Sequence, residues 1–107
     1  MSRKPPVPEP PEPPEGLSEA SLALWQAIVP RRARSPERLA LIETALRARD
    51  RAAAARETLV RDGMTFTTAE TGAIHVHPAV RILKDAETTF LAAWRAMHLE
   101  WGPLDSG

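Results

Sequence analysis

The sequence predicts a mainly α-helical protein, an antiparallel hairpin of two long helices with a short β-hairpin between them. Two stretches with apolar residues at three- and four-residue spacing predict the long helices. A threonine-rich run and a second β-prone run, separated by a turn sequence, predict the β-hairpin. A short helix and a proline-rich tail are expected before them. At 107 residues the chain has room for one small domain.

The first 16 residues contain most of the eleven prolines and almost no apolar side chains to bury. This composition favours an extended polyproline-like or disordered backbone. We therefore expect a tail over 1–16, either a solvated arm or a proline-rich ligand for an aromatic groove. A single helical domain for oligomerisation and DNA recognition is expected over 17–103, with a second short tail over 104–107.

A short amphipathic helix is predicted to begin after Leu17 and to end at Pro30. Ser18 suits its N-cap position. Its apolar residues recur at helical spacing, namely Leu22, Trp25, Ile28 and Val29.

A long helix is predicted from Pro36 to about Asp62, a length of roughly 40 Å at 1.5 Å per residue. Ser35 can cap it, and proline suits the first helical position. Gly63 supplies the left-handed residue that commonly ends a helix.

One face of this helix repeats apolar residues in a heptad pattern built largely of alanine. Alanine lets helices approach closely, and a neighbouring row that includes Ile42 and Val60 widens the stripe toward more than one partner. Because so small a domain has few elements to cover these stripes, we expect self-association. The predicted core and oligomer interface is formed by Leu41, Ala45, Ala48, Ala52, Ala55, Leu59, Phe90 and Trp94.

The segment that follows changes from helical to β-prone character. Residues 65–68 predict one strand, 70–72 a turn and 74–77 a second strand. The last helix is predicted from Pro78 to about Leu99. Its apolar stripe consists of Leu83, Ala86, Phe90, Trp94, Met97 and Trp101.

His75 and His77 are the residues that suggest a metal site. Positions i and i+2 of a strand face the same side, so both imidazoles could reach one ion. Two ligands do not complete a site, and Glu70 and Asp85 lack diagnostic spacing. We therefore predict no metal, with His75 on the polar face of the hairpin and His77 at the entry to the last helix.

Motifs of enzymes and cofactor sites are missing from the sequence. It contains no glycine-rich phosphate loop, no G-x-S-x-G, no H-E-x-x-H and no cysteine nucleophile. We therefore expect a non-catalytic protein without a cofactor and without ATP hydrolysis of its own.

Charge is balanced over the whole chain but segregated along it. Residues 31–62 carry nine arginines against five acidic residues, whereas residues 63–107 carry three basic residues against five acidic ones. An arginine cluster lies where the first two helices join, and guanidinium groups beside a helix N-terminus suit phosphates. The predicted DNA-binding residues are Arg31, Arg32, Arg34 and Arg38. The alternative interpretation is an ordinary solvated arginine surface.

Several motifs occur together in the second half of the chain: Asp62-Gly63 after a long arginine- and alanine-rich helix, Gly72 in the hairpin, and His77-Pro78-Ala79 opening the last helix. Over roughly residues 39–103 the chain resembles the helix–hairpin–helix family of tailed-phage terminase small subunits. The family often closes with Gly-Leu-Thr-Pro, where this chain has Trp101-Gly102-Pro103.

The resemblance implies a ring-forming homo-oligomer that recognises double-stranded phage DNA and regulates the terminase large subunit, an ATPase and nuclease. It also implies that His77 is structural. The absence of cysteine and of an apolar run of about 20 residues agrees with an expected soluble protein of the host cytoplasm. The alternative is a helical structural or adaptor oligomer that does not bind DNA.

Overall fold

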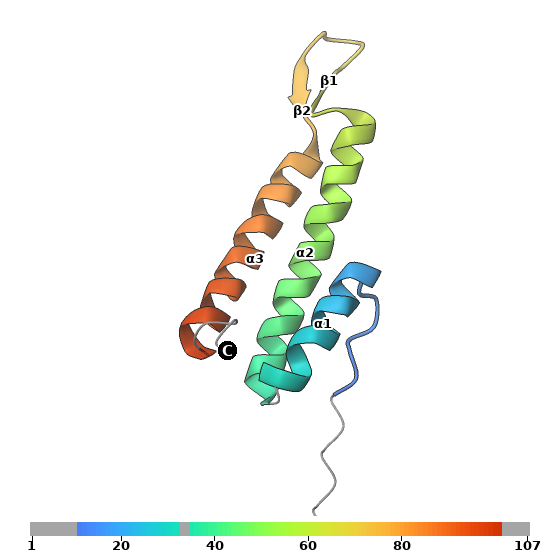
Figure 1. The fold of residues 1–107 in the computed structure, drawn as a ribbon. Coiled ribbons are helices and arrows are strands. Elements are labelled where there is room, and N and C mark those ends of the chain that lie inside the picture. Colours follow the sequence, from blue (N-terminus) through green and yellow to red (C-terminus); the bar gives the residue numbers. More distant parts are fainter. Residues whose placement is uncertain (1–10, 33–34, 102–107) are drawn as a thin grey trace, which may run out of the picture.

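The computed structural model describes residues 11–32 and 35–101, with side chains described for 11–30 and 35–97. In these residues α2 and α3 run side by side in opposite directions, the β-hairpin projects from one end, and α1 lies along the other half of α2 (Figure 1). The mainly helical fold predicted from the sequence is confirmed. The elements are α1 (Glu19–Arg32), α2 (Pro36–Asp62), β1 (Thr65–Thr67), β2 (Ile74–Val76) and α3 (Pro78–Trp101).

The ends of α2 lie where its capping residues predict them. Ser35 has an extended backbone, and its hydroxyl accepts a hydrogen bond from the Arg38 backbone N–H at 3.4 Å. Pro36 occupies the first helical turn, where a missing N–H costs nothing. At the other end Gly63 has φ 83°, and its N–H donates to the Leu59 carbonyl at 2.8 Å.

The first helix begins as predicted but is longer than expected. The Ser18 hydroxyl accepts from the Ser21 backbone N–H at 3.2 Å, as an N-cap does. The helix then continues past Pro30 to Arg32, so the predicted end at Pro30 is wrong. A proline inside a helix removes one backbone hydrogen bond and crowds the carbonyl four residues earlier, and α1 bears this cost at Pro30 without ending there.

Two serines of the first turn of α1 are tied to a carboxylate in the middle of α2. Asp50 accepts hydrogen bonds from the Ser18 backbone N–H at 2.8 Å, from the Ser18 hydroxyl at 2.6 Å and from the Ser21 hydroxyl. Partial burial of the carboxylate opposes its ionisation, but these hydrogen bonds outweigh it and hold the pKa of Asp50 below its usual value. The contact fixes α1 on α2.

The core lies where the three helices meet. Apolar side chains of α1, α2 and α3 interlock there, and the buried set is Trp25, Val29, Ile42, Ala45, Leu46, Ala93 and Met97. Trp25 is 4% exposed, and its indole N–H donates to the Pro11 carbonyl at 3.3 Å. This part of the predicted tail therefore contacts α1, while residues 1–10 lie outside the described residues.

Across the described ranges, we find no helix that combines the length and the apolar character needed to cross a membrane.

Candidate interaction surface on the helical hairpin

The β-hairpin is a two-stranded antiparallel sheet in which Phe66 lies opposite His75. Its loop is closed by the Gly72 N–H, which donates to the Thr68 carbonyl at 2.8 Å, and Gly72 adopts the left-handed φ of 70°. All six strand residues are exposed. A two-stranded sheet alone is marginal in water, so its geometry depends on how it is held to the helices.

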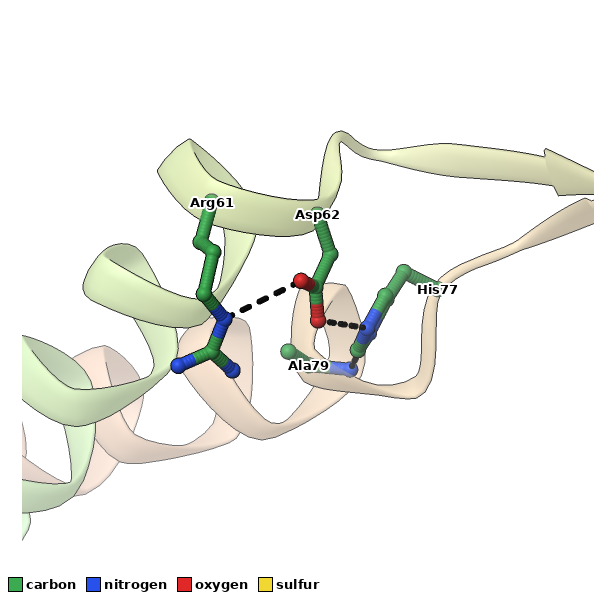
Figure 2. Close-up of polar contacts among 4 residues, drawn as sticks. All are labelled: Arg61, Asp62, His77 and Ala79. Carbon is green, nitrogen blue, oxygen red and sulfur yellow. Dashed lines mark hydrogen bonds and ion pairs between the residues drawn. The ribbon is translucent and has the colours of Figure 1, made fainter.

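His77 joins the hairpin to both long helices. Its Nδ1 accepts a hydrogen bond from the Ala79 backbone N–H at 3.0 Å, which caps the start of α3. Its Nε2 lies 3.3 Å from Asp62 Oδ2 at the end of α2 (Figure 2). Because Nδ1 is an acceptor, a neutral ring carries its proton on Nε2 and donates it to the Asp62 carboxylate.

Asp62 is held on both of its oxygens. Arg61 Nε lies 3.1 Å from Oδ1, and the imidazole of His77 contacts Oδ2 (Figure 2). The hydrogen bond from Arg61 and, to a smaller extent, the contact with His77 lower the pKa of Asp62. The carboxylate therefore stays ionised at neutral pH and orients the ring that caps α3.

The two histidines have separate partners. The His75 ring stacks on Phe66 with centroids 5.2 Å apart, whereas His77 is engaged with Asp62 and Ala79. Within the part of the chain that the structure describes, no group of three or more histidine or acidic residues is placed to hold a metal ion. The predicted polar face around His75 thus includes an aromatic ring.

One side of the α2–α3 hairpin carries a long apolar surface, which we call the Val60 face. Two adjoining hollows lie along it and share Arg56, so the surface is continuous. Val60 is 88% exposed and Met64 61% exposed. Arg56 Nη2 lies 3.3 Å from Glu87 Oε2 across the face. The apolar residues of the Val60 face are Leu59, Val60, Met64, Leu83, Phe90 and Leu91.

Another hollow is lined by residues that do not belong to the Val60 face, and we call its surface the Ala54 face. Its α2 residues are mostly small, and Ile82 of α3 is 51% exposed beside them. The residues of the Ala54 face are Arg51, Ala54, Ala55, Thr58, Ala79 and Ile82. His77 also lines this hollow, so the joint that fixes the hairpin borders it.

The eight predicted interface residues divide into two groups. The four alanines of the seam are buried within the chain, at 0–5% exposure, so they belong to its own core. The other four are partly exposed: Leu41, Leu59, Phe90 and Trp94. Leu59 and Phe90 line the Val60 face, and Trp94 stacks on Phe90 with centroids 5.5 Å apart.

The predicted DNA-binding arginines lie around the joint between α1 and α2. Arg31 and Arg32 are in the last turn of α1, with side chains outside the described set, and Arg34 lies outside the described residues. Arg38 is in the first turn of α2 and is partly exposed. From the sequence, Val60 was named only as part of a widened stripe, and Met64 and Ile82 were not singled out. The exposure of a side chain depends on which other elements cover it, and the apolar pattern of one helix does not contain that information.

Comparisons of the chain with protein-family models, curated proteins and solved structures found no match.

Proposed function

We propose that this protein is a terminase small subunit, a non-catalytic homo-oligomer that recognises phage DNA for packaging. The observation that carries the proposal is the order of the elements. A long arginine-rich helix, a β-hairpin and a second long helix follow one another, with His77 at the last joint. This order is the one that the motif resemblance implies.

DNA contact is proposed at the joint between α1 and α2. The N-terminus of α2 presents the positive end of its helix dipole there, and four arginines lie within a few residues of it in the sequence. Arginine forks bind phosphate oxygens through paired hydrogen bonds. Such contacts depend little on base sequence, so several copies acting together on one DNA segment would raise the affinity for DNA and not its sequence specificity.

The proposed partner of the assembly is the terminase large subunit, which would supply ATP hydrolysis and DNA cleavage. The small subunit would act by holding DNA and by contacting that enzyme, and its own side chains would carry out no chemistry.

A second candidate function is a helical structural or adaptor oligomer that does not bind DNA. The exposed apolar side chains of the Val60 face and the β-hairpin favour it, because they indicate a protein interface without any reference to nucleic acid.

Retention of double-stranded DNA at low and high salt separates the two functions. We expect binding at low salt that weakens steeply with added salt, because each phosphate contact contributes a slope of about −0.9 in log K against log salt. Replacing Arg31, Arg32 and Arg34 together with glutamine should lower this slope by about 2 to 3.

The matched control replaces the three basic residues of α3 with glutamine, namely Arg81, Lys84 and Arg95. It removes the same charge at a different place, so it should leave most of the binding intact. Equal losses in the two triple variants would refute a DNA site at the joint. Absence of salt-sensitive binding in the unaltered protein would favour the adaptor.

A further inference from the structure

We infer that the groove along α1 beside Trp25 binds the chain's own acidic, proline-rich tail, and that this tail competes with DNA for the arginines at the joint between α1 and α2. The segment that occupies the groove is residues 9–15, Glu-Pro-Pro-Glu-Pro-Pro-Glu, which we call the acidic strap. The competition rests on the proposed function, because it concerns access to the proposed DNA site.

The described part of the acidic strap lies on α1. The indole N–H of Trp25 donates a hydrogen bond to the Pro11 carbonyl at 3.3 Å. Pro11 and Pro13 line a hollow together with Trp25 and Pro30 of α1. Grooves lined by aromatic side chains recognise proline-rich segments in this way, and a buried indole N–H needs an acceptor. This surface of α1 therefore suits a proline-rich ligand, and the chain supplies one.

The exposure of the acidic strap repeats every three residues. Pro11 and Pro14 are half-buried, whereas Glu12 and Glu15 are exposed. A polyproline helix has three residues per turn, so residues three apart share one edge. The proline edge is thus partly covered, and the carboxylates share an edge that is open to a charged partner. In the sequence, Glu9 continues the acidic spacing.

The direction of the tail brings it toward the arginines. Residues 11–16 run along α1 in the opposite direction, with Pro11 toward the C-terminal end of the helix (Figure 1). Arg31 and Arg32 follow Trp25 by about 9–11 Å along α1, at 1.5 Å per residue. One polyproline turn covers about 9 Å, so an extended chain before Pro11 would lie level with these arginines.

The charges of the acidic strap and of the joint are opposite. The strap carries three glutamates and no basic residue, since Arg3 and Lys4 precede it, whereas residues 31–38 carry four arginines and one glutamate, a balance of +3. Only a short turn around Gly16, which has φ 86°, separates the strap from α1. So short a tether gives an effective concentration on the order of millimolar. Weak ion pairs are then formed in part of the molecules, and DNA phosphates must displace them.

Competition of this kind lowers the apparent affinity for DNA in proportion to the fraction of molecules with a free joint. Exposed ion pairs are weak, so the acidic strap should cover the joint only part of the time. Removal of its carboxylates should raise the affinity for DNA about three-fold, which corresponds to a joint that is free in about one third of the molecules.

The DNA test compares two variants of the full chain on one double-stranded fragment at low salt. The strap variant replaces the three strap glutamates with glutamine. The control variant makes the same change of net charge with amides at three exposed residues in the half of the protein that carries the β-hairpin, namely Glu57, Glu70 and Asp85. The strap variant should bind about three times more tightly than the control. Equal affinities would overturn the competition, because net charge alone would then explain the gain.

The contact itself is measured by NMR without DNA, from the indole N–H resonance of Trp25 and the backbone amide resonance of Glu12. Both resonances should move when the three arginines of the joint are replaced with glutamine, because the acidic strap loosens. Both should stay in place in the α3 variant that serves as the control for DNA retention. Resonances that the arginine replacement leaves unmoved would overturn the strap.

The two measurements separate this inference from the proposed function. Absence of DNA binding in the unaltered protein and in every variant would overturn the proposed function and the competition with it. The NMR result alone decides whether the acidic strap contacts the joint, since no DNA is present. Moved resonances together with tighter DNA binding by the strap variant would support both.

Discussion

Replacing Asp50 with alanine should loosen α1 from the helical hairpin. The substitution removes the acceptor of three hydrogen bonds from Ser18 and Ser21. Ser21 is fully buried, and a buried hydroxyl that loses its partner costs about 1–3 kcal/mol. The Ser21 hydroxyl keeps a second acceptor, the Leu46 carbonyl at 3.4 Å. The cost of losing Asp50 at this hydroxyl should therefore be near the lower end of that range.

The two bonds from Ser18 are exposed, so each should contribute about 0.5–1 kcal/mol because water can replace the lost acceptor. The expected loss for Asp50→Ala is therefore about 2–3 kcal/mol in the free energy of unfolding. Urea unfolding followed by tryptophan fluorescence measures it, since Trp25 of α1 is buried in the core. Protein concentration must be equal in all samples, because assembly adds to apparent stability.

The matched control is Asp85→Ala. Asp85 contacts Arg81 at 3.9 Å, and both side chains are exposed, so its loss should change stability by less than about 0.5 kcal/mol. An unfolding midpoint of Asp50→Ala that equals that of Asp85→Ala would refute the role assigned to Asp50. Asp50→Asn, which keeps one acceptor oxygen, should lie between the two.

Three further perturbations test other parts of the fold. Because the pKa of Asp50 is lowered in the folded protein, its contribution to the free energy of unfolding is complete above the usual carboxyl pKa of about 3.9 and is lost as pH falls through the lower folded value. The urea midpoints of Asp50→Ala and of the unaltered protein should therefore converge in acid. Ala48→Leu should lower the melting temperature by overpacking a fully buried site, at a cost of about 1–3 kcal/mol, and an unchanged melting temperature would contradict the tight α2–α3 contact. His77→Ala should cost about 1–2 kcal/mol through loss of the α3 cap, whereas His77→Asn should restore most of it; equal unfolding midpoints for the two would contradict the capping role.

The sequence was sufficient to predict those parts of the fold that depend on local chemistry. Ser35, Pro36 and Gly63 act within one turn of the helix ends, so the bounds of α2 follow from them directly. The position of the hairpin follows in the same way from β-prone runs around a glycine turn. The end of α1 was mistaken because Pro30 removes one hydrogen bond from the helix and crowds one carbonyl without ending it.

The tertiary contacts were less accessible to sequence reasoning. A heptad seam of alanines predicts that a helix packs there, but the spacing is the same whether that helix belongs to the same chain or to another. In the structure the seam is buried within the chain. The link between Asp50 and Ser18 joins residues that are far apart in the sequence, and neither residue belongs to a motif that signals the other.

Burial of the alanines has a direct consequence for assembly. Once α2 and α3 have used the seam between themselves, the surfaces left for other copies are the two sides of the helical hairpin and its β-tip. Both sides carry large exposed apolar residues, Val60 and Met64 on one and Ile82 on the other. The proposed homo-oligomer would bring several copies of the arginine-rich joint onto one assembly. A joint that holds phosphate weakly in one chain would then bind DNA strongly through the number of copies, so any variant that lowers the mass of the proposed oligomer should also lower DNA retention.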